Sequence, residues 1–182
     1  MRKFFLTLFF IFITSQAQTS IKDKIIKNLE NTENLAFSFE QNINGKVENG
    51  ECILQYPKKI LCKYNLKNKK ILVSNGRSLV IKTLSSYYIY PIEKTPLNLI
   101  LDKNFFLKKI KSLKERTVNE KFINYTFLED ENEINIFFDK ETYNLIGWQT
   151  LDIYQNLSIT YLSTINKNIK LKKNLFKLPS QN

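Results

Sequence analysis

Beyond residue 18, apolar and polar positions alternate over most of the chain, which is the pattern of half-buried β-strands. In residues 35–41, for example, Leu35, Phe37 and Phe39 are separated by small or polar side chains. Similar runs predict further strands at 51–56, 60–66, 71–74, 78–83, 87–90, 109–118, 122–129, 133–138, 145–152, 157–163 and 169–177. The pairs Asn44-Gly45 and Asn75-Gly76 are turn signals between such runs.

Two segments follow a helical period instead. Residues 20–31 begin with a Ser20 cap and a matching Asp23, and their apolar positions fall on one face. At Thr95-Pro96, threonine can cap a helix and proline can take its first position, before an apolar stripe. The pattern predicts a single sheet-dominated domain with two short helical elements. A large antiparallel sheet usually curls, so its concave side is either a packed core or a cleft for an apolar ligand.

The N-terminus has the organisation of a secretory signal. Arg2 and Lys3 precede a short apolar stretch at 4–13, and small residues stand at Ser15 and Ala17. We expect cleavage after residue 17, which leaves residues 18–182 as one domain; the alternative is an uncleaved membrane anchor. Because no cysteine follows the apolar stretch, the lipid-attachment motif of bacterial lipoproteins is absent. We therefore expect a soluble mature protein outside the cytoplasm.

The composition excludes several kinds of catalytic and metal-binding site. The chain has no histidine, so a Ser-His-Asp or Cys-His arrangement and a histidine-based metal site are excluded. Two cysteines cannot by themselves form a four-sulfur zinc site. The acidic run from Glu129 to Glu133 stands between two predicted strands and is typical of a solvated turn. We expect no catalytic residue, no metal and no cofactor.

The net charge is positive, with 28 basic and 17 acidic side chains. Nearly all the basic residues are lysines, and they are scattered rather than clustered on one element. Removal of Arg2 and Lys3 with the signal lowers the net charge from +11 to +9. Lysine, asparagine and isoleucine are together what AT-rich codons encode, so we expect no nucleic-acid partner. Attraction to an anionic membrane surface fits the charge better.

An ordered set of short motifs resembles the LolA family of periplasmic outer-membrane lipoprotein carriers. The motifs are Phe39-x-Gln41, Gly50-Glu51-Cys52-Ile53-Leu54, Tyr56-Pro57, Tyr64, residues 71–76 and 87–90, Thr95-Pro96-Leu97, residues 137–139, 145–152 and 158–162, and Phe176-x-Leu178-Pro179. No single motif is specific, but their order and spacing cover nearly the whole mature chain.

The resemblance implies an incomplete, half-open antiparallel β-barrel with short α-helices as a lid over an apolar concave face. It also implies a monomeric periplasmic chaperone that accepts triacylated lipoproteins from an inner-membrane ABC transporter. The chaperone would deliver them to the outer-membrane receptor LolB or its equivalent. One exposed acyl chain costs on the order of 10 kcal/mol, at about 0.8 kcal/mol per methylene, so an aqueous gap requires such a shelter.

Residue by residue, the resemblance assigns an acyl-chain cavity and a lid. The cavity residues are Leu35, Phe37, Phe39, Leu54, Tyr56 and Tyr64. The lid residues are Leu97, Ile100 and Leu101. Many family members carry arginine at the position of Tyr56, where it bonds the lid closed. A phenol can donate one hydrogen bond but supplies no charged fork, so Lys58 or Lys59 is the alternative latch.

Cys52 and Cys62 invite a disulfide, because the expected compartment is oxidising. If Tyr56 pairs with Leu61 across the turn, however, the two sulfurs are offset by roughly 10 Å along the strands. That offset exceeds what a disulfide accepts unless a bulge shifts the register. We therefore expect two buried thiols that act as small apolar fillers, with a disulfide as the alternative.

Two other functions share the expected fold. A LolB-like receptor is usually a lipoprotein, and this chain lacks the required cysteine. A periplasmic module that senses lipids or lipoproteins normally carries an additional domain, and we expect none in this chain. A carboxylate-based hydrolase is disfavoured, because no set of acidic residues converges in the predicted strands.

Overall fold

The computed structural model describes residues 19–114, 116–118, 121–129, 132–152 and 154–181. The predicted signal peptide at 1–17 lies outside the described residues, so its cleavage stays a prediction. Within the described part, no helix is long and apolar enough to cross a membrane.

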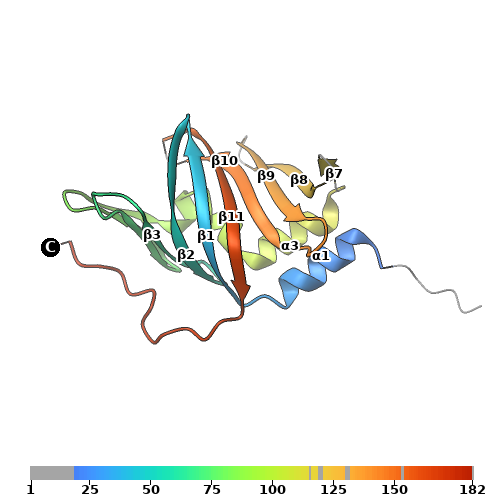
Figure 1. The fold of residues 1–182 in the computed structure, drawn as a ribbon, viewed down its shortest axis with the longest axis horizontal. Helices are drawn as coiled ribbons and strands as arrows, with labels where there is room; N and C mark the ends of the chain where they lie inside the picture. The colour runs from blue at the N-terminus through green and yellow to red at the C-terminus, as the bar shows by residue number, and fades with distance from the viewer. Residues whose placement is uncertain (1–18, 115, 119–120, 130–131, 153, 182) are drawn as a thin grey trace, which may run out of the picture.

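The described strands form a single antiparallel sheet that does not close on itself (Figure 1). Its eleven strands within the described residues are β1 (Asn34–Ile43), β2 (Lys46–Gln55), β3 (Lys59–Tyr64), β4 (Ile71–Asn75), β5 (Ser78–Lys82), β6 (Tyr87–Pro91), β7 (Arg116–Val118), β8 (Phe122–Glu129), β9 (Asn132–Asp139), β10 (Leu145–Leu151) and β11 (Leu157–Lys167). They are ordered β6-β5-β4-β3-β2-β1-β11-β10-β9-β8-β7. Strands β6 and β7 are the two ends, and the pairing of β11 with β1 joins the two halves of the chain. The predicted open barrel is confirmed.

Helices cover one side of this sheet. They are α1 (Ile21–Glu30), α2 (Leu97–Leu101) and α3 (Lys103–Ser112), with a 3₁₀ turn at Ile92–Lys94 before α2. Figure 1 shows α1 and α3 crossing the same side of β8–β11. Phe106 of α3 is fully buried and stacks on Phe138 of β9, with ring centroids 6.0 Å apart. The helices and the concave side of the sheet thus enclose the core.

The predicted strand at 109–118 is wrong in its first part, because α3 extends to Ser112. The Asp102 side chain accepts a hydrogen bond from the Phe105 N–H at 3.1 Å and caps the helix. Phe106, Leu107 and Ile110 are then buried together on one helical face. Only the last three residues of the prediction form a strand, β7.

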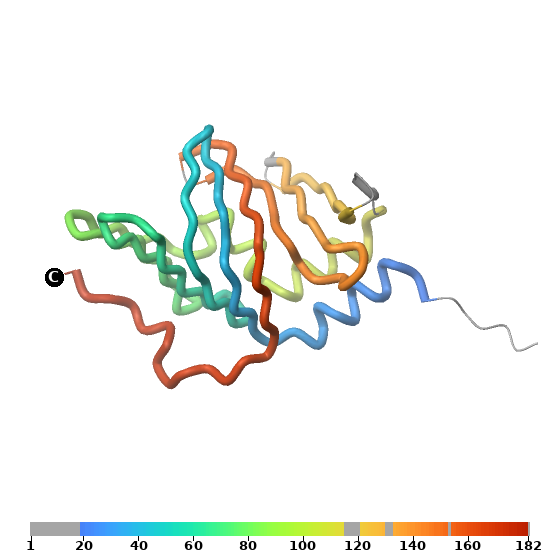
Figure 2. The backbone as a smooth tube through the Cα atoms, in the orientation of Figure 1, coloured from blue at the N-terminus to red at the C-terminus, as the bar shows by residue number. Residues whose placement is uncertain are grey.

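The predicted strand at 169–177 is also wrong. Both edges of β11 are already paired, with β1 and β10, so no free edge lies beside the chain when it leaves the sheet. Instead the C-terminal segment runs along the outside of β2 and β3, as the tube in Figure 2 shows. Its end is held near β5 and β6, where the Tyr87 hydroxyl donates to the Pro179 carbonyl at 3.3 Å.

Candidate functional site

A cavity of about 170 Å³ lies between the concave side of the sheet and the start of α2. Its wall is formed by residues of β1–β5, β10 and β11, most of which stand at alternating positions of their strands. Most of its wall is apolar and is formed by Phe37, Phe39, Ile43, Cys52, Ile60, Cys62, Leu72, Leu79, Ile81, Pro96, Leu97, Trp148 and Leu151. A space of this kind can hold an apolar group away from water.

Part of the wall is polar. Gln41 of β1 lies two residues beyond Phe39 on the same face, and its amide Nε2 donates to the hydroxyls of Ser158 and Thr160, at 3.0 and 3.2 Å. Thr150 of β10 also lines the cavity. The hydroxyl of Tyr64 donates to the Gln41 carbonyl oxygen at 3.4 Å, which joins β3 to this polar group.

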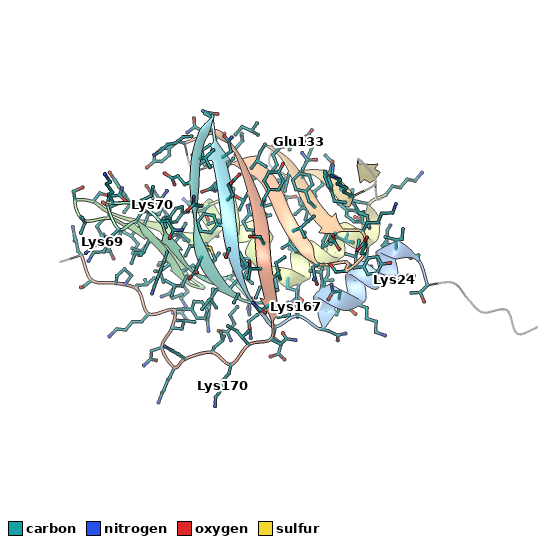
Figure 3. All side chains as sticks on the ribbon, in the orientation of Figure 1. Lys24, Lys69, Lys70, Glu133, Lys167 and Lys170 are labelled. Carbon is teal, nitrogen blue, oxygen red and sulfur yellow. A yellow bond between two sulfur atoms is a disulfide. The ribbon has the colours of Figure 1, made fainter. Side chains whose placement is uncertain are left out.

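A buried charge supports the rim beside Tyr64. Glu48 is only 4 % exposed, and its carboxylate lies 2.5 Å from the Lys70 ammonium and 3.0 Å from that of Lys46. Burial alone would raise the pKa of Glu48, but the hydrogen bonds from the two lysines outweigh it and hold the pKa below 4.5. Lys70, labelled in Figure 3, also lies 4.1 Å from the centroid of the Tyr64 ring. Burial and, to a lesser extent, Glu48 raise the pKa of Tyr64, so its phenol stays neutral.

The structure separates the predicted cavity residues into two groups. Phe37, Phe39 and Tyr64 line the cavity, and so does Leu97 of α2. The remaining predicted residues belong to the hydrophobic core and do not line it; they are Leu35, Leu54, Tyr56, Ile100 and Leu101.

Sequence reasoning missed the polar residues and much of the apolar wall. Gln41, Ser158 and Thr160 continue the inward-facing positions of their strands, so the alternation itself was the available signal. It was not decisive, because a polar residue in an inward register is easily taken as the end of the buried run. Trp148, the single tryptophan, lies on the neighbouring part of the cavity wall and was also not predicted to line the cavity.

The expectation of two free thiols is wrong: Cys52 and Cys62 form a disulfide. The hairpin is tighter than predicted, since Gln55 pairs with Lys59 and only residues 56–58 connect the strands. Cys52 therefore lies directly opposite Cys62, with Cα atoms 4.1 Å apart, instead of three residues away. The disulfide crosslinks β2 to β3 in the cavity wall.

The contact between this hairpin and α2 is made by Lys58. Its backbone N–H donates to the Leu101 carbonyl at 2.9 Å, and its ammonium lies 3.4 Å from the carboxylate of Asp102. Asp102 ends α2 and caps α3, so one ion pair holds both helices to the hairpin. The Tyr56 hydroxyl is buried without a hydrogen-bond partner among the described residues, and burial raises its pKa. Lys59 instead faces the C-terminal segment.

Lysines occur on separate parts of the described molecule. Figure 3 labels Lys24 on α1, Lys69 before β4 and Lys170 on the C-terminal segment, which are well separated. Several lysines are engaged by the fold: Lys103 donates to the backbone carbonyls of Glu30, at the end of α1, and of Thr32, and Lys109 pairs with Glu129 at 2.6 Å.

The family model described as "Outer membrane lipoprotein carrier protein LolA" matches residues 30–179. No curated protein sequence matches the chain. Among solved structures, an uncharacterized conserved protein from Thermus thermophilus has a TM-score of 0.52 and 8 % identity, over 89 % of this chain and 93 % of its own. MucB has a TM-score of 0.51 and 10 % identity, over 88 % of this chain and 62 % of its own. A LolA superfamily protein from Nitrosomonas europaea has a TM-score of 0.47 and 6 % identity, over 87 % and 96 %. At these identities the likeness is one of fold.

Proposed function

Because the chain belongs to the LolA family of outer-membrane lipoprotein carrier proteins, we propose that it carries lipoproteins and shields their acyl chains. The observation that carries the proposal is the apolar cavity between the open sheet and α2. Moving one acyl chain from water into such a cavity is favourable by on the order of 10 kcal/mol, at about 0.8 kcal/mol per methylene. This gain offsets the cost of exposing the acyl chain to water when a lipoprotein leaves a membrane.

We place the carrier in the periplasm, between an inner-membrane ABC transporter that releases triacylated lipoproteins and an outer-membrane receptor such as LolB. The family description supports carriage of outer-membrane lipoproteins, and the N-terminal signal supports export. Shielding and release require binding only, so the carrier acts without a catalytic residue, metal or cofactor, as a monomer.

The proposed acyl-chain contacts are the predicted residues that line the cavity, Phe37, Phe39, Tyr64 and Leu97. Leu35, Leu54 and Tyr56 act from beneath, as the packed floor on which Ile100 and Leu101 of the lid rest. In this reading α2 is the lid, and the ion pair between Lys58 and Asp102 is its latch.

The size of the cavity requires the lid to move. Its volume of about 170 Å³ is below the ~300 Å³ at which ligand pockets usually begin. We therefore infer that the cavity widens when it takes up an acyl chain. The free edges β6 and β7 allow the sheet to widen, because no hydrogen-bond ladder joins them in the described part of the chain.

The carrier function is tested with the mature protein and inner-membrane vesicles that contain the transporter and a labelled lipoprotein. We expect the protein to draw the lipoprotein into the soluble fraction in an ATP-dependent manner. No release by folded protein in the presence of active transporter would contradict the carrier role. Binding of an acyl probe without such release would instead indicate a lipid-sensing module.

Cavity binding is tested by a charge at the cavity wall. Ile81 lines the cavity and is only partly buried, so Ile81→Glu should leave the fold intact. We expect it to weaken binding of a fluorescent fatty-acyl probe by at least about tenfold, because a carboxylate would face the apolar chain. The matched control is Leu128→Glu, at a position that is 66 % exposed and does not line the cavity. Equal binding by both variants would place the acyl site elsewhere.

A further inference from the structure

We propose that Gln41, Thr150, Ser158 and Thr160 form a polar subsite for the carbonyl of an ester or amide that links an acyl chain to its carrier molecule. This inference deepens the proposed function and rests on it. On this inference the cavity has a polar end and an apolar end. The cavity would therefore bind acylated ligands in preference to plain hydrocarbon.

The four side chains come together because of strand register. Gln41 on β1 is paired with Thr160 on β11, and Ser158 on β11 is paired with Thr150 on β10. Ser158 and Thr160 are two residues apart and face the same side of the sheet. The subsite therefore spans three adjacent strands, and each of its members lines the cavity.

The hydrogen bonding leaves donors for a ligand. Both Ser158 and Thr160 accept from the Gln41 amide, and neither hydroxyl has an acceptor of its own in the described part of the chain. The Thr150 side chain lines the same cavity wall beside them. These three residues are only 3–6 % exposed, so bulk water reaches them poorly.

An ester or amide carbonyl matches this arrangement. Its oxygen accepts up to two hydrogen bonds, and an ester carries no donor that would compete for them. A carbonyl oxygen can accept hydrogen bonds from the hydroxyls in this wall, whereas a methylene cannot. Hydrocarbon beyond the carbonyl then lies against the apolar wall formed by Phe39, Leu72, Leu79 and Leu97.

The test compares two lipopeptides with the same peptide and chain length, one with two ester-linked acyl chains and one with two ether-linked alkyl chains. Binding is followed by the fluorescence of Trp148, which lines the cavity. We expect the mature wild-type protein to bind the diester about tenfold more tightly than the diether. In Ser158→Ala/Thr160→Val the ratio should fall to about one, mainly by loss of diester affinity. Ser163→Ala, at an exposed position of the same strand, is the matched control and should keep the wild-type ratio.

The outcomes separate the two proposals. Binding of neither lipopeptide would contradict the proposed function and the subsite together. Binding of both with equal affinity by the wild type, or an unchanged ratio in the double variant, would contradict the subsite alone.

A measurement on the wild type keeps the inference testable if the double variant does not fold. The infrared stretching frequency of a ¹³C-labelled ester carbonyl should be lower in the bound lipopeptide than in an alkane solvent, because hydrogen bonding to a carbonyl lowers this frequency. A bound carbonyl at the alkane frequency would overturn the subsite.

Discussion

Individual residues of the β2–β3 hairpin decide how the cavity wall is built. Glycine at position 50 lets β3 approach, because a Cβ there would lie 2.1 Å from the backbone carbonyl oxygen of Lys63. Two residues further along β2, Cys52 meets Cys62 directly. Close strand approach and covalent crosslinking thus act on neighbouring positions of one hairpin.

The close approach gives the first prediction. Gly50→Ala should destabilise the protein by about 3 kcal/mol, since the clash is with backbone that can yield only by separating the strands. Gly45→Ala is the control: its Cβ would meet nothing within 4 Å, and only its φ of +85° is unfavourable for alanine. We expect about 1 kcal/mol there. Denaturant unfolding measures both, and equal losses would contradict the steric explanation.

The buried carboxylate of Glu48 predicts a dependence on pH. Its pKa in the folded chain is lowered from 4.5, so it stabilises the fold fully above that value and stops doing so as the pH falls through the folded-state pKa. We expect wild type to exceed Glu48→Gln in stability by about 1–3 kcal/mol at pH 7. The difference should shrink steadily below pH 4.5.

Urea unfolding across the pH range checks this expectation. Glu141→Gln, in an exposed turn, serves as the control and should change stability by less than about 0.5 kcal/mol. A difference between wild type and Glu48→Gln that stays constant through acid pH would show that the loss is one of packing rather than charge.

At the scale of elements, most strands and helix α1 follow from the sequence because their apolar positions have a clear period. The strand at Phe122–Glu129, for example, has the predicted bounds. Helix α3 was missed because lysines stand among its apolar residues in the sequence, although Phe106, Leu107 and Ile110 have helical spacing and Asp102 provides a cap. The C-terminal segment was misassigned because a strand pattern does not say whether a sheet edge is free.

Part of the candidate site was also predictable from the alternation of apolar residues along the strands. Phe37 and Phe39 have an inward register that any alternating strand reveals, and they line the cavity. The disulfide depended on the length of the 56–58 turn, which local sequence does not determine. Likewise, the cluster around Gln41 requires the register between β1 and β11, whose paired residues are more than 100 positions apart in the chain.

The latch between the hairpin and the helices gives a prediction for α2. Asp102→Asn removes the ion pair with Lys58 but keeps an oxygen that can cap α3. Because the two side chains are about 30 % exposed, the pair contributes only ~0.3–1 kcal/mol. Hydrogen exchange of the α2 amides should accordingly rise about two- to fivefold.

The control for this experiment is Lys111→Met, which breaks a more exposed pair with Glu30 and does not touch α2. It should leave α2 exchange unchanged. If Asp102→Asn behaved in the same way, the backbone bond from Lys58 to Leu101 would be the effective latch.

At the scale of the whole molecule, the fold combines a sheet that is covalently fixed at one place with ends that are not joined. The disulfide and the long β1–β11 pairing hold the centre, whereas β6 and β7 end the described sheet without pairing to each other. The C-terminal segment braces the outer face of β2 and β3 and is tied near β6 by the Tyr87 hydroxyl. Movement for ligand entry is therefore expected at the helices and the free edges, rather than at the centre.

This division predicts the kinetics of uptake. If the cavity of about 170 Å³ widens before an acyl chain enters, as we propose, the observed binding rate should level off as the concentration of an acyl probe rises. Stopped-flow fluorescence of Trp148, in the cavity wall, measures this rate. Asp102→Asn should raise the plateau about two- to fivefold, by the same factor as α2 exchange, because both processes begin with the release of Lys58. A rate that rises linearly with probe concentration to the highest values reached would contradict entry through an opening step. A plateau that is unchanged in Asp102→Asn would place that step at the free edge β6 instead of the lid.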